Sequence, residues 1–436
     1  MNIFLMGQCS LHWGRMEFGN IGNYYIIEPF IRELYRVFPD CEIRTTFQMS
    51  ARFCADEKIT ILPMDLYYGW TDKDLADALR DIEIAKSFSE TGKLEEKTPF
   101  IEAVLWADLV IDFSGDIWGD NADFLGANRF EVGLLKDRVA QLMGKRTVML
   151  AGSPGPFGNQ RLKNLAQIVY KSFDLVTNRE PLSTALLERQ GFDCSNTLSL
   201  ACPAFLFEPA PRDKIANTLE EIWDFGGEEK KPVVGFILCG WNFEDGPFDK
   251  WPRDGSDYEV FVEAVELISE ELGARVCLMS HSNGFDIPPA DFKLKHGRDY
   301  PIAKQLQQVV EKRGIAQDVI ALDGVYDTWE TKTIIGSMDM LVSGRVHAAV
   351  AALSQHVPTV VIDYGHEPKA HKLKGFATIA GVEKYVVDPS SKGALKKGVK
   401  ACWENLDANK AFLLSHMPSV RKQAKTHFDL LKSLKR

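Results

Sequence analysis

Residues 339–352 read DMLVSGRVHAAVAA, a short apolar run followed by an alanine-rich one. Its apolar run at 340–342 predicts a buried strand, and Ser343-Gly344 predicts the turn that ends it. An alanine-rich segment with strong helix propensity follows this turn at once. A strand that passes directly into a helix is the repeating unit of parallel α/β sheets.

The same alternation runs along most of the 436 residues. Apolar runs predict strands at 3–6, 108–113, 146–151, 174–177, 233–238, 275–279, 319–322, 338–342 and 358–363. Amphipathic stretches predict helices at 24–38, 129–143, 161–171, 258–272, 302–312 and 347–353. We therefore expect an α/β protein whose parallel sheets carry helices on both faces.

Two segments mark a change of domain. Residues 208–211 form a stiff proline segment, and residues 226–232 are charged and glycine-containing. We expect an N-terminal domain at 1–210, a C-terminal domain at 232–390 and a helical segment at 391–436 that packs across both. Open parallel sheets bind ligands at the carboxyl ends of their strands, so we expect a ligand cleft between the two sheets.

Composition narrows the class of partner. The chain has 51 Lys and Arg against 61 Asp and Glu, a formal charge of −10, which argues against nucleic acid or an anionic membrane as main partner. The longest apolar runs have about nine residues, against the ~20 that span a bilayer. Residues 2–7 look like a strand rather than a signal peptide, and the eight cysteines form no CxxC pair. We expect a cytoplasmic protein without membrane span or structural metal.

The turn at 343–347 carries the most informative chemistry. A helix N-terminus offers free N–H groups and a partial positive charge to an anion. Arg345 adds a two-pronged donor for a carboxylate or phosphate, and His347 adds a proton donor or acceptor. A structural alternative is that Arg345 forms a salt bridge within its domain and that His347 caps or packs.

The run Ser343-Gly344-Arg345-Val346-His347 resembles the S-G-R-x-H motif of the polysaccharide pyruvyl transferase family. Further motifs similar to those of the family follow the same order over about residues 1–385: 19–23, 114–116, 152–156, 178–183 and 203–205. The resemblance implies two Rossmann-like domains in a GT-B-like arrangement. It also implies transfer of an enolpyruvyl group from phosphoenolpyruvate to a sugar, with a cyclic pyruvate ketal as product.

Roles follow from the resemblance and from the charges that this donor carries. The expected donor-binding residues are Arg345, Arg179, Ser343 and Gly344, with the two arginines as clamps. His347 is the expected general acid, and Asp116 the expected base for the sugar hydroxyls. No redox cofactor or metal enters this scheme.

Each role has a structural alternative. Arg179 would otherwise form a surface pair with Glu180, and Asp116 would be an Asx-type turn residue. Asn20 and Gly22 shape either a loop over donor or acceptor, or a helix-capping turn. His281 follows a strand of the second domain and is expected to border the cleft.

Several points stay open. The family has a lysine whose counterpart here is Lys369, Lys372 or Lys374. The chain departs from the family pattern at Asn23, Asp116, Cys202 and Cys239-Gly240-Trp241, which leaves the acceptor undefined. The expected partners are phosphoenolpyruvate and a sugar of a glycan precursor, and a homo-oligomer is compatible with both. The alternatives are a GT-B-type glycosyltransferase with a nucleotide-sugar donor and a non-catalytic ligand-binding protein.

Overall fold

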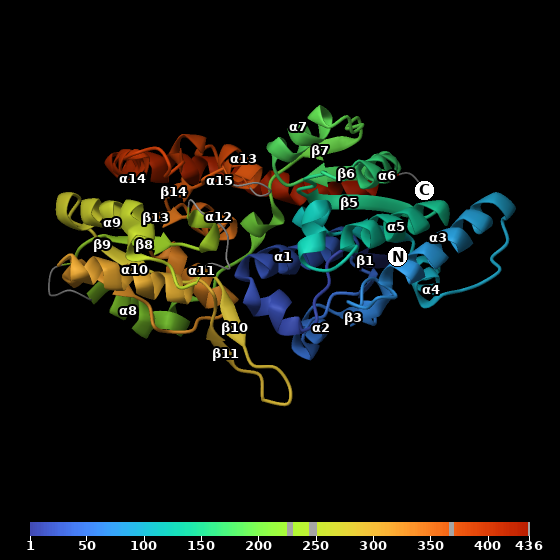
Figure 1. The fold of residues 1–436 in the computed structure, drawn as a ribbon, viewed down its shortest axis with the longest axis horizontal. Helices are drawn as coiled ribbons and strands as arrows, with labels where there is room; N and C mark the ends of the chain where they lie inside the picture. The colour runs from blue at the N-terminus through green and yellow to red at the C-terminus, as the bar shows by residue number, and fades with distance from the viewer. Residues whose placement is uncertain (225–229, 244–250, 366–369, 435–436) are drawn as a thin grey trace. The chain divides into compact units, whose positions relative to one another are not determined.

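The computed structural model describes residues 1–224, 230–243, 251–365 and 370–434. The chain forms two compact units (Figure 1). Unit 1 comprises Met1–Met16, Phe30–Cys202 and Gln423–Arg436, and unit 2 comprises Glu17–Pro29 and Pro203–Lys422. Each unit is built around one parallel sheet, which confirms the α/β fold class.

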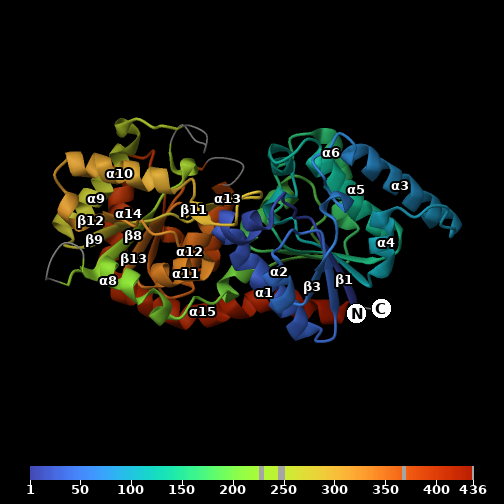
Figure 2. The same ribbon diagram turned by 90° about the horizontal axis from the view of Figure 1, so that it is seen from below.

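Unit 1 contains a seven-stranded sheet in the order β3-β2-β1-β4-β5-β6-β7, and every neighbouring pair is parallel. Its strands are β1 (Asn2–Met6), β2 (Glu42–Thr45), β3 (Ile59–Ile61), β4 (Leu109–Asp112), β5 (Arg146–Gly152), β6 (Leu175–Asn178) and β7 (Thr197–Ser199). Its helices are α2 (Ala51–Asp56), α3 (Asp74–Thr91), α4 (Pro99–Trp106), α5 (Arg129–Leu142), α6 (Gln160–Lys171) and α7 (Pro181–Arg189). Helices α3 and α5 pack against each other (Figure 2).

Unit 2 contains a six-stranded parallel sheet in the order β12-β9-β8-β13-β14-β15. Its strands are β8 (Val233–Ile237), β9 (Arg275–Leu278), β12 (Val319–Ala321), β13 (Met340–Ser343), β14 (Thr359–Ile362) and β15 (Val386–Val387). Its helices are α8 (Ala216–Asp224), α9 (Glu259–Glu266), α10 (Tyr300–Lys312), α11 (Thr328–Gly336), α12 (Val346–Leu353), α13 (Ala370–Ile379) and α14 (Ala394–Glu404). None of the described helices is long and apolar enough to cross a bilayer.

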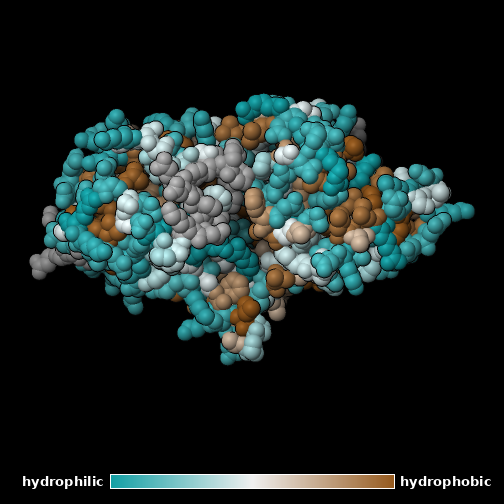
Figure 3. Space-filling view, viewed as in Figure 1, coloured by the Kyte–Doolittle hydropathy of each residue, from teal (hydrophilic) through white to brown (hydrophobic). Residues whose placement is uncertain are grey.

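A two-stranded antiparallel hairpin interrupts the alternation in unit 2. Strands β10 (Asn283–Phe285) and β11 (Leu294–His296) lie between β9 and α10 and project from the unit (Figure 1). Apolar surface gathers on this hairpin (Figure 3), where Ile287 is 55% exposed. The sequence patterns do not predict it, because its polar and proline-rich tip lacks a strand signal.

The boundary between the units lies after Cys202, earlier than the expected break at 208–232. The proline segment is packed rather than free: Lys332 donates to the Phe207 carbonyl, and Thr333 Oγ1 donates to the Ala210 carbonyl at 2.7 Å. Both donors belong to α11, so this segment is part of unit 2. Residues 226–229 of the second expected linker lie outside the described residues.

Two helices contribute to both units. In α1 (Ile21–Val37) the first residues belong to unit 2 and the later ones to unit 1. In α15 (Leu406–Asp429) the order is the same: the residues up to Lys422 belong to unit 2 and those from Gln423 onward belong to unit 1. The expected ranges 1–210 and 391–436 therefore do not coincide with the two units.

His427 anchors the end of α15 within unit 1. Its Nδ1 lies 2.7 Å from Thr177 Oγ1, and its Nε2 lies 2.8 Å from the Ala201 carbonyl oxygen. A neutral imidazole satisfies both contacts, because one nitrogen accepts and the other donates. The ring is fully buried, and burial lowers the pKa of His427 to about 4.

This buried ring makes stability depend on pH. Between pH 6.5 and 4 the unfolded chain binds a proton that the folded chain does not, so acid lowers the free energy of unfolding. The contribution of His427 is at most about 3 kcal/mol, complete above pH 6.5 and lost as the pH falls to 4. We expect His427→Gln to flatten the dependence of thermal stability on pH over this range. His416→Gln, on the same helix, is the control, and equal slopes for both variants would contradict the assignment.

Candidate functional site

The turn after β13 is held at the carboxyl edge of the unit 2 sheet. Strand β13 lies between β8 and β14, and Ser343 at its end is fully buried. Ser343 Oγ accepts from the Arg345 N–H at 3.0 Å, and the Gly344 N–H donates to the Ile237 carbonyl at 3.2 Å. A side chain at Gly344 would overlap Asn242, so only glycine fits here.

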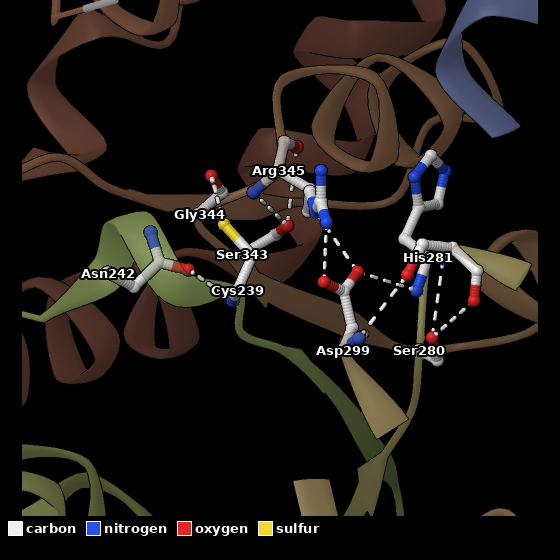
Figure 4. A network of polar contacts seen from close by, with 9 residues as sticks. Cys239, Asn242, Ser280, His281, Asp299, Ser343, Gly344 and Arg345 are labelled. Carbon is white, nitrogen blue, oxygen red and sulfur yellow. Dashed lines mark hydrogen bonds and ion pairs between the residues drawn. The ribbon is translucent and has the colours of Figure 1, made fainter. Parts of the chain in front are cut away.

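Arg345 is held by a carboxylate that no sequence motif marked. Its Nε donates to Asp299 Oδ2 at 3.0 Å, and its Nη2 donates to Asp299 Oδ1 (Figure 4). The Asp299 side chain is 1% exposed and the Arg345 side chain 17%. Burial alone would lower the pKa of the guanidinium, but the Asp299 charge raises it above its ordinary value, so Arg345 stays charged. The alternative of a salt bridge within the domain is therefore correct.

This ion pair still leaves one edge of the guanidinium accessible. Arg345 Nη1 makes no hydrogen bond to any described residue, and the Arg345 side chain is 17% exposed. The Arg345 main chain precedes α12, whose first-turn N–H groups begin at Val346. The turn therefore combines an accessible guanidinium edge with a helix N-terminus, which suits a carboxylate or phosphate.

His347 stands in the first turn of α12 and is half-buried. Its ring lies edge-on to Phe376, with 5.8 Å between the ring centroids. Gly22, in the first turn of α1, lies directly against the His347 imidazole. The structure thus shows His347 in packing contact, while the role of general acid stays a prediction.

His281 belongs to the same cluster of side chains, which comprises Arg345, Asp299, His347 and His281. It follows β9, it is 1% exposed, and its main-chain N–H donates to Asp299 Oδ2 at 3.2 Å. Its ring packs edge-on against Tyr25, with centroids 5.5 Å apart. His281 Nε2 and the Tyr25 hydroxyl are both buried without a hydrogen-bond partner among the described residues.

The His281 imidazole is neutral. Burial, followed by the positive charges of Arg345 and His347, lowers its pKa well below the ordinary value. A buried polar atom without a hydrogen-bond partner costs about 1–3 kcal/mol, so the unpaired Nε2 of His281 is an unfavourable feature near the charge of Arg345.

Unit 1 brings Arg179 and Asp116 together. Arg179 follows β6, is buried, and donates from Nε to Ser153 Oγ at 2.9 Å. Its Nη2 lies 3.9 Å from Asp116 Oδ1. The alternative of a surface pair with Glu180 is wrong, because Glu180 is buried and caps α7 by accepting from the Ser183 N–H.

The remaining expected residues have local contacts. Asn20 precedes α1 and donates from Nδ2 to Asn23 Oδ1 at 3.2 Å, a contact between side chains that does not cap a main-chain N–H of the helix. Lys372 is buried and Lys374 exposed, whereas Lys369 lies outside the described residues, so the counterpart of the family lysine stays open. Among the described residues no group of three His, Cys, Asp or Glu could hold a metal ion.

Asp299 is the residue that sequence reasoning missed. Its contacts join it to Arg345, 46 positions away, and no spacing rule links such distant residues. A weaker signal existed, because Asp299 stands just before Tyr300-Pro301, where a helix with an early proline begins.

Comparison with known proteins decides the family. The family model described as polysaccharide pyruvyl transferase matches residues 20–366, which is most of the chain. The chain belongs to the polysaccharide pyruvyl transferase family. It is therefore a transferase, and the Ser343–His347 run and the cluster around it lie within the matched region. The chain is also 23% identical over 370 residues to the amylovoran biosynthesis protein AmsJ of Erwinia amylovora, covering 81% of this chain and 83% of that protein.

Solved structures establish the fold of this pyruvyl transferase family member. The Anabaena protein HepE in complex with UDP has a TM-score of 0.57 at 13% identity, over 99% of this chain and 98% of that one. A glycosyltransferase from Rickettsia africae has a TM-score of 0.58 at 12% identity, with the same coverage. These likenesses show the GT-B-like fold.

The close approach of Gly22 to His347 is testable. We expect Gly22→Ala to lower stability by about 1–3 kcal/mol and to displace the His347 ring, because the added methyl group overlaps the imidazole. Chemical denaturation measures the first effect, and the His347 imidazole resonance measures the second. Gly255→Ala, whose methyl group would meet only Val309 at 3.8 Å, is the control. An unshifted His347 resonance would contradict the packing.

Proposed function

We propose that this chain transfers an enolpyruvyl group from phosphoenolpyruvate to a sugar of a polysaccharide or glycoconjugate precursor and forms a pyruvate ketal. The observation that carries the proposal is the family's S-G-R-x-H run at the start of α12, with one guanidinium edge of Arg345 accessible. The relative from Erwinia amylovora is named for a biosynthetic role, which supports this direction.

The charges of the turn match those of the donor. Phosphoenolpyruvate carries a carboxylate and a phosphate, and both are recognised by forked N–H donors and by helix N-termini. Arg345 Nη1 and the first N–H groups of α12 are such donors. Arg179 of unit 1 keeps its expected role as second clamp, with Ser153 and Asp116 as its partners.

The chemistry balances without a cofactor. The methylene carbon of the donor takes up one proton and becomes the methyl group of the ketal, and the departing phosphate takes up another; His347 delivers one of these two protons. The two sugar hydroxyls each lose a proton, and Asp116 accepts one of them. One sugar hydroxyl oxygen bonds to the former enol carbon, the bond from that carbon to the phosphate oxygen breaks, and a second hydroxyl closes the ring. The products are the ketal and inorganic phosphate. The scheme needs no redox cofactor and no metal, and it suits a cytoplasmic enzyme.

The direct test offers purified protein phosphoenolpyruvate together with nucleotide-linked or lipid-linked sugars. We expect inorganic phosphate to be released with at least one acceptor, and phosphoenolpyruvate to bind in a calorimeter. No binding and no release with any acceptor would refute the proposal. The alternative, a glycosyltransferase with a nucleotide-sugar donor, predicts thermal stabilisation by UDP or GDP but not by phosphoenolpyruvate.

His347→Ala tests the general acid. We expect turnover to fall by roughly 10²–10⁴-fold with a modest change in donor affinity, because the proton donor is lost while the anion contacts remain. The measurement is phosphate release at saturating donor, with donor affinity from calorimetry. Unchanged turnover would remove His347 from the mechanism.

Arg345→Lys tests the two-pronged contact. A lysine ammonium cannot bond both oxygens of Asp299 and still present a planar edge to the donor. We expect donor affinity to fall by about tenfold or more. Arg212→Lys, at an exposed position of unit 2, is the matched control. Equal affinities for the two variants would exclude Arg345 as a clamp.

A further inference from the structure

The buried carboxylate of Asp299 accepts several hydrogen bonds in the unit 2 site. It accepts from Nε and Nη2 of Arg345 and from the main-chain N–H of His281. Its own main-chain N–H donates to Ser282 Oγ at 3.3 Å. Figure 4 shows the contacts of Arg345 and His281 converging on the Asp299 carboxylate, from segments that follow β13 and β9.

We propose that Asp299 is a positioning residue for Arg345: its two oxygens fix the guanidinium plane so that Nη1 presents to the donor anion. This inference rests on the proposed function. A guanidinium is planar, and a bidentate carboxylate occupies one of its edges and sets the direction of the others. A single contact would leave the plane free to turn about that bond.

Asp299 can hold this plane because it is itself fixed. It is 1% exposed and stands directly before α10, and its contacts with His281 and Ser282 tie it to the end of β9. The same contacts close the base of the β10–β11 hairpin, since Ser282 precedes β10 and Asp299 follows β11. The orientation of Arg345 is thus set by the sheet and the hairpin base together.

The negative charge of Asp299 allows an experiment to distinguish a positioning role from simple electrostatic attraction of the donor. Asp299 offsets the charge of Arg345, so a carboxylate at this place weakens the long-range pull on a dianion. If charge alone decided donor binding, removing the carboxylate would tighten it. If orientation decides it, the same change weakens binding, although the site becomes more positive.

The experiment is a double-mutant cycle on the full-length protein, with phosphoenolpyruvate titrated in a calorimeter. We expect Asp299→Asn to weaken binding by at least about fivefold. In an Arg345→Gln background the same substitution should change affinity less than about twofold, because Asp299 then has no guanidinium to orient. Asp291→Asn, at an exposed position on the hairpin, is the control and should bind like the wild type.

Ser282→Ala provides a milder variant in case Asp299→Asn does not fold. It removes the hydroxyl that anchors Asp299 and changes no charge, and we expect a smaller loss of affinity that also vanishes in the Arg345→Gln background. The inference is overturned if Asp299→Asn binds phosphoenolpyruvate as tightly as Asp291→Asn or more tightly. It is also overturned if the loss persists in full without Arg345. No binding by the wild type would instead overturn the proposed function.

Discussion

A buried ion pair at the carboxyl edge of a parallel sheet is the constraint on which the unit 2 site depends. Asp299 offsets the cost of burying the Arg345 guanidinium, which for a lone charge amounts to several kcal/mol. Two strands that flank β8 bring the residues together: Asp299 is tied to the end of β9, and Arg345 follows β13. The sheet thus supplies the geometry, and the ion pair supplies a fixed cation.

Unit 1 contains a similar arrangement, in which an arginine that follows a strand lies beside an aspartate. Arg179 follows β6 and precedes α7, as Arg345 follows β13 and precedes α12. Each arginine lies beside an aspartate, Asp116 in one unit and Asp299 in the other. The ion pair in unit 1 is longer, with 3.9 Å between Arg179 Nη2 and Asp116 Oδ1. In unit 1 the arginine Nε donates to Ser153, whereas in unit 2 it donates to Asp299. Parallel sheets favour this repetition, because every strand delivers its loop and helix N-terminus to the same edge.

The sequence predicted the strands that are apolar along their length and missed strands that are short or carry charged residues. The nine expected strands are all present, since a strand covered on both faces must be apolar along its length. Strand β2 was missed because Glu42 and Arg44 interrupt its apolar pattern, and β15 because it has two residues. The hairpin was missed because its proline-rich tip carries no alternation.

The residues of the candidate site also fall into two groups: those that local sequence patterns predict and those that they do not. Arg345, His347 and His281 were found because motif and strand end coincide in the sequence. Asp299 and the burial of Arg179 depend on contacts between segments far apart in the chain, and local patterns do not encode these. The prediction of a linker at 208–211 is wrong for a related reason. This segment packs on α11, and its own prolines do not reveal that contact.

A crystal structure of the protein soaked with phosphoenolpyruvate tests most directly whether the Arg345–Asp299 pair holds the donor. We expect the ligand at the N-terminus of α12, with an anionic oxygen on Arg345 Nη1 and the Arg345–Asp299 pair intact. A ligand bound elsewhere, or UDP seated at this turn while phosphoenolpyruvate fails to bind, would contradict it.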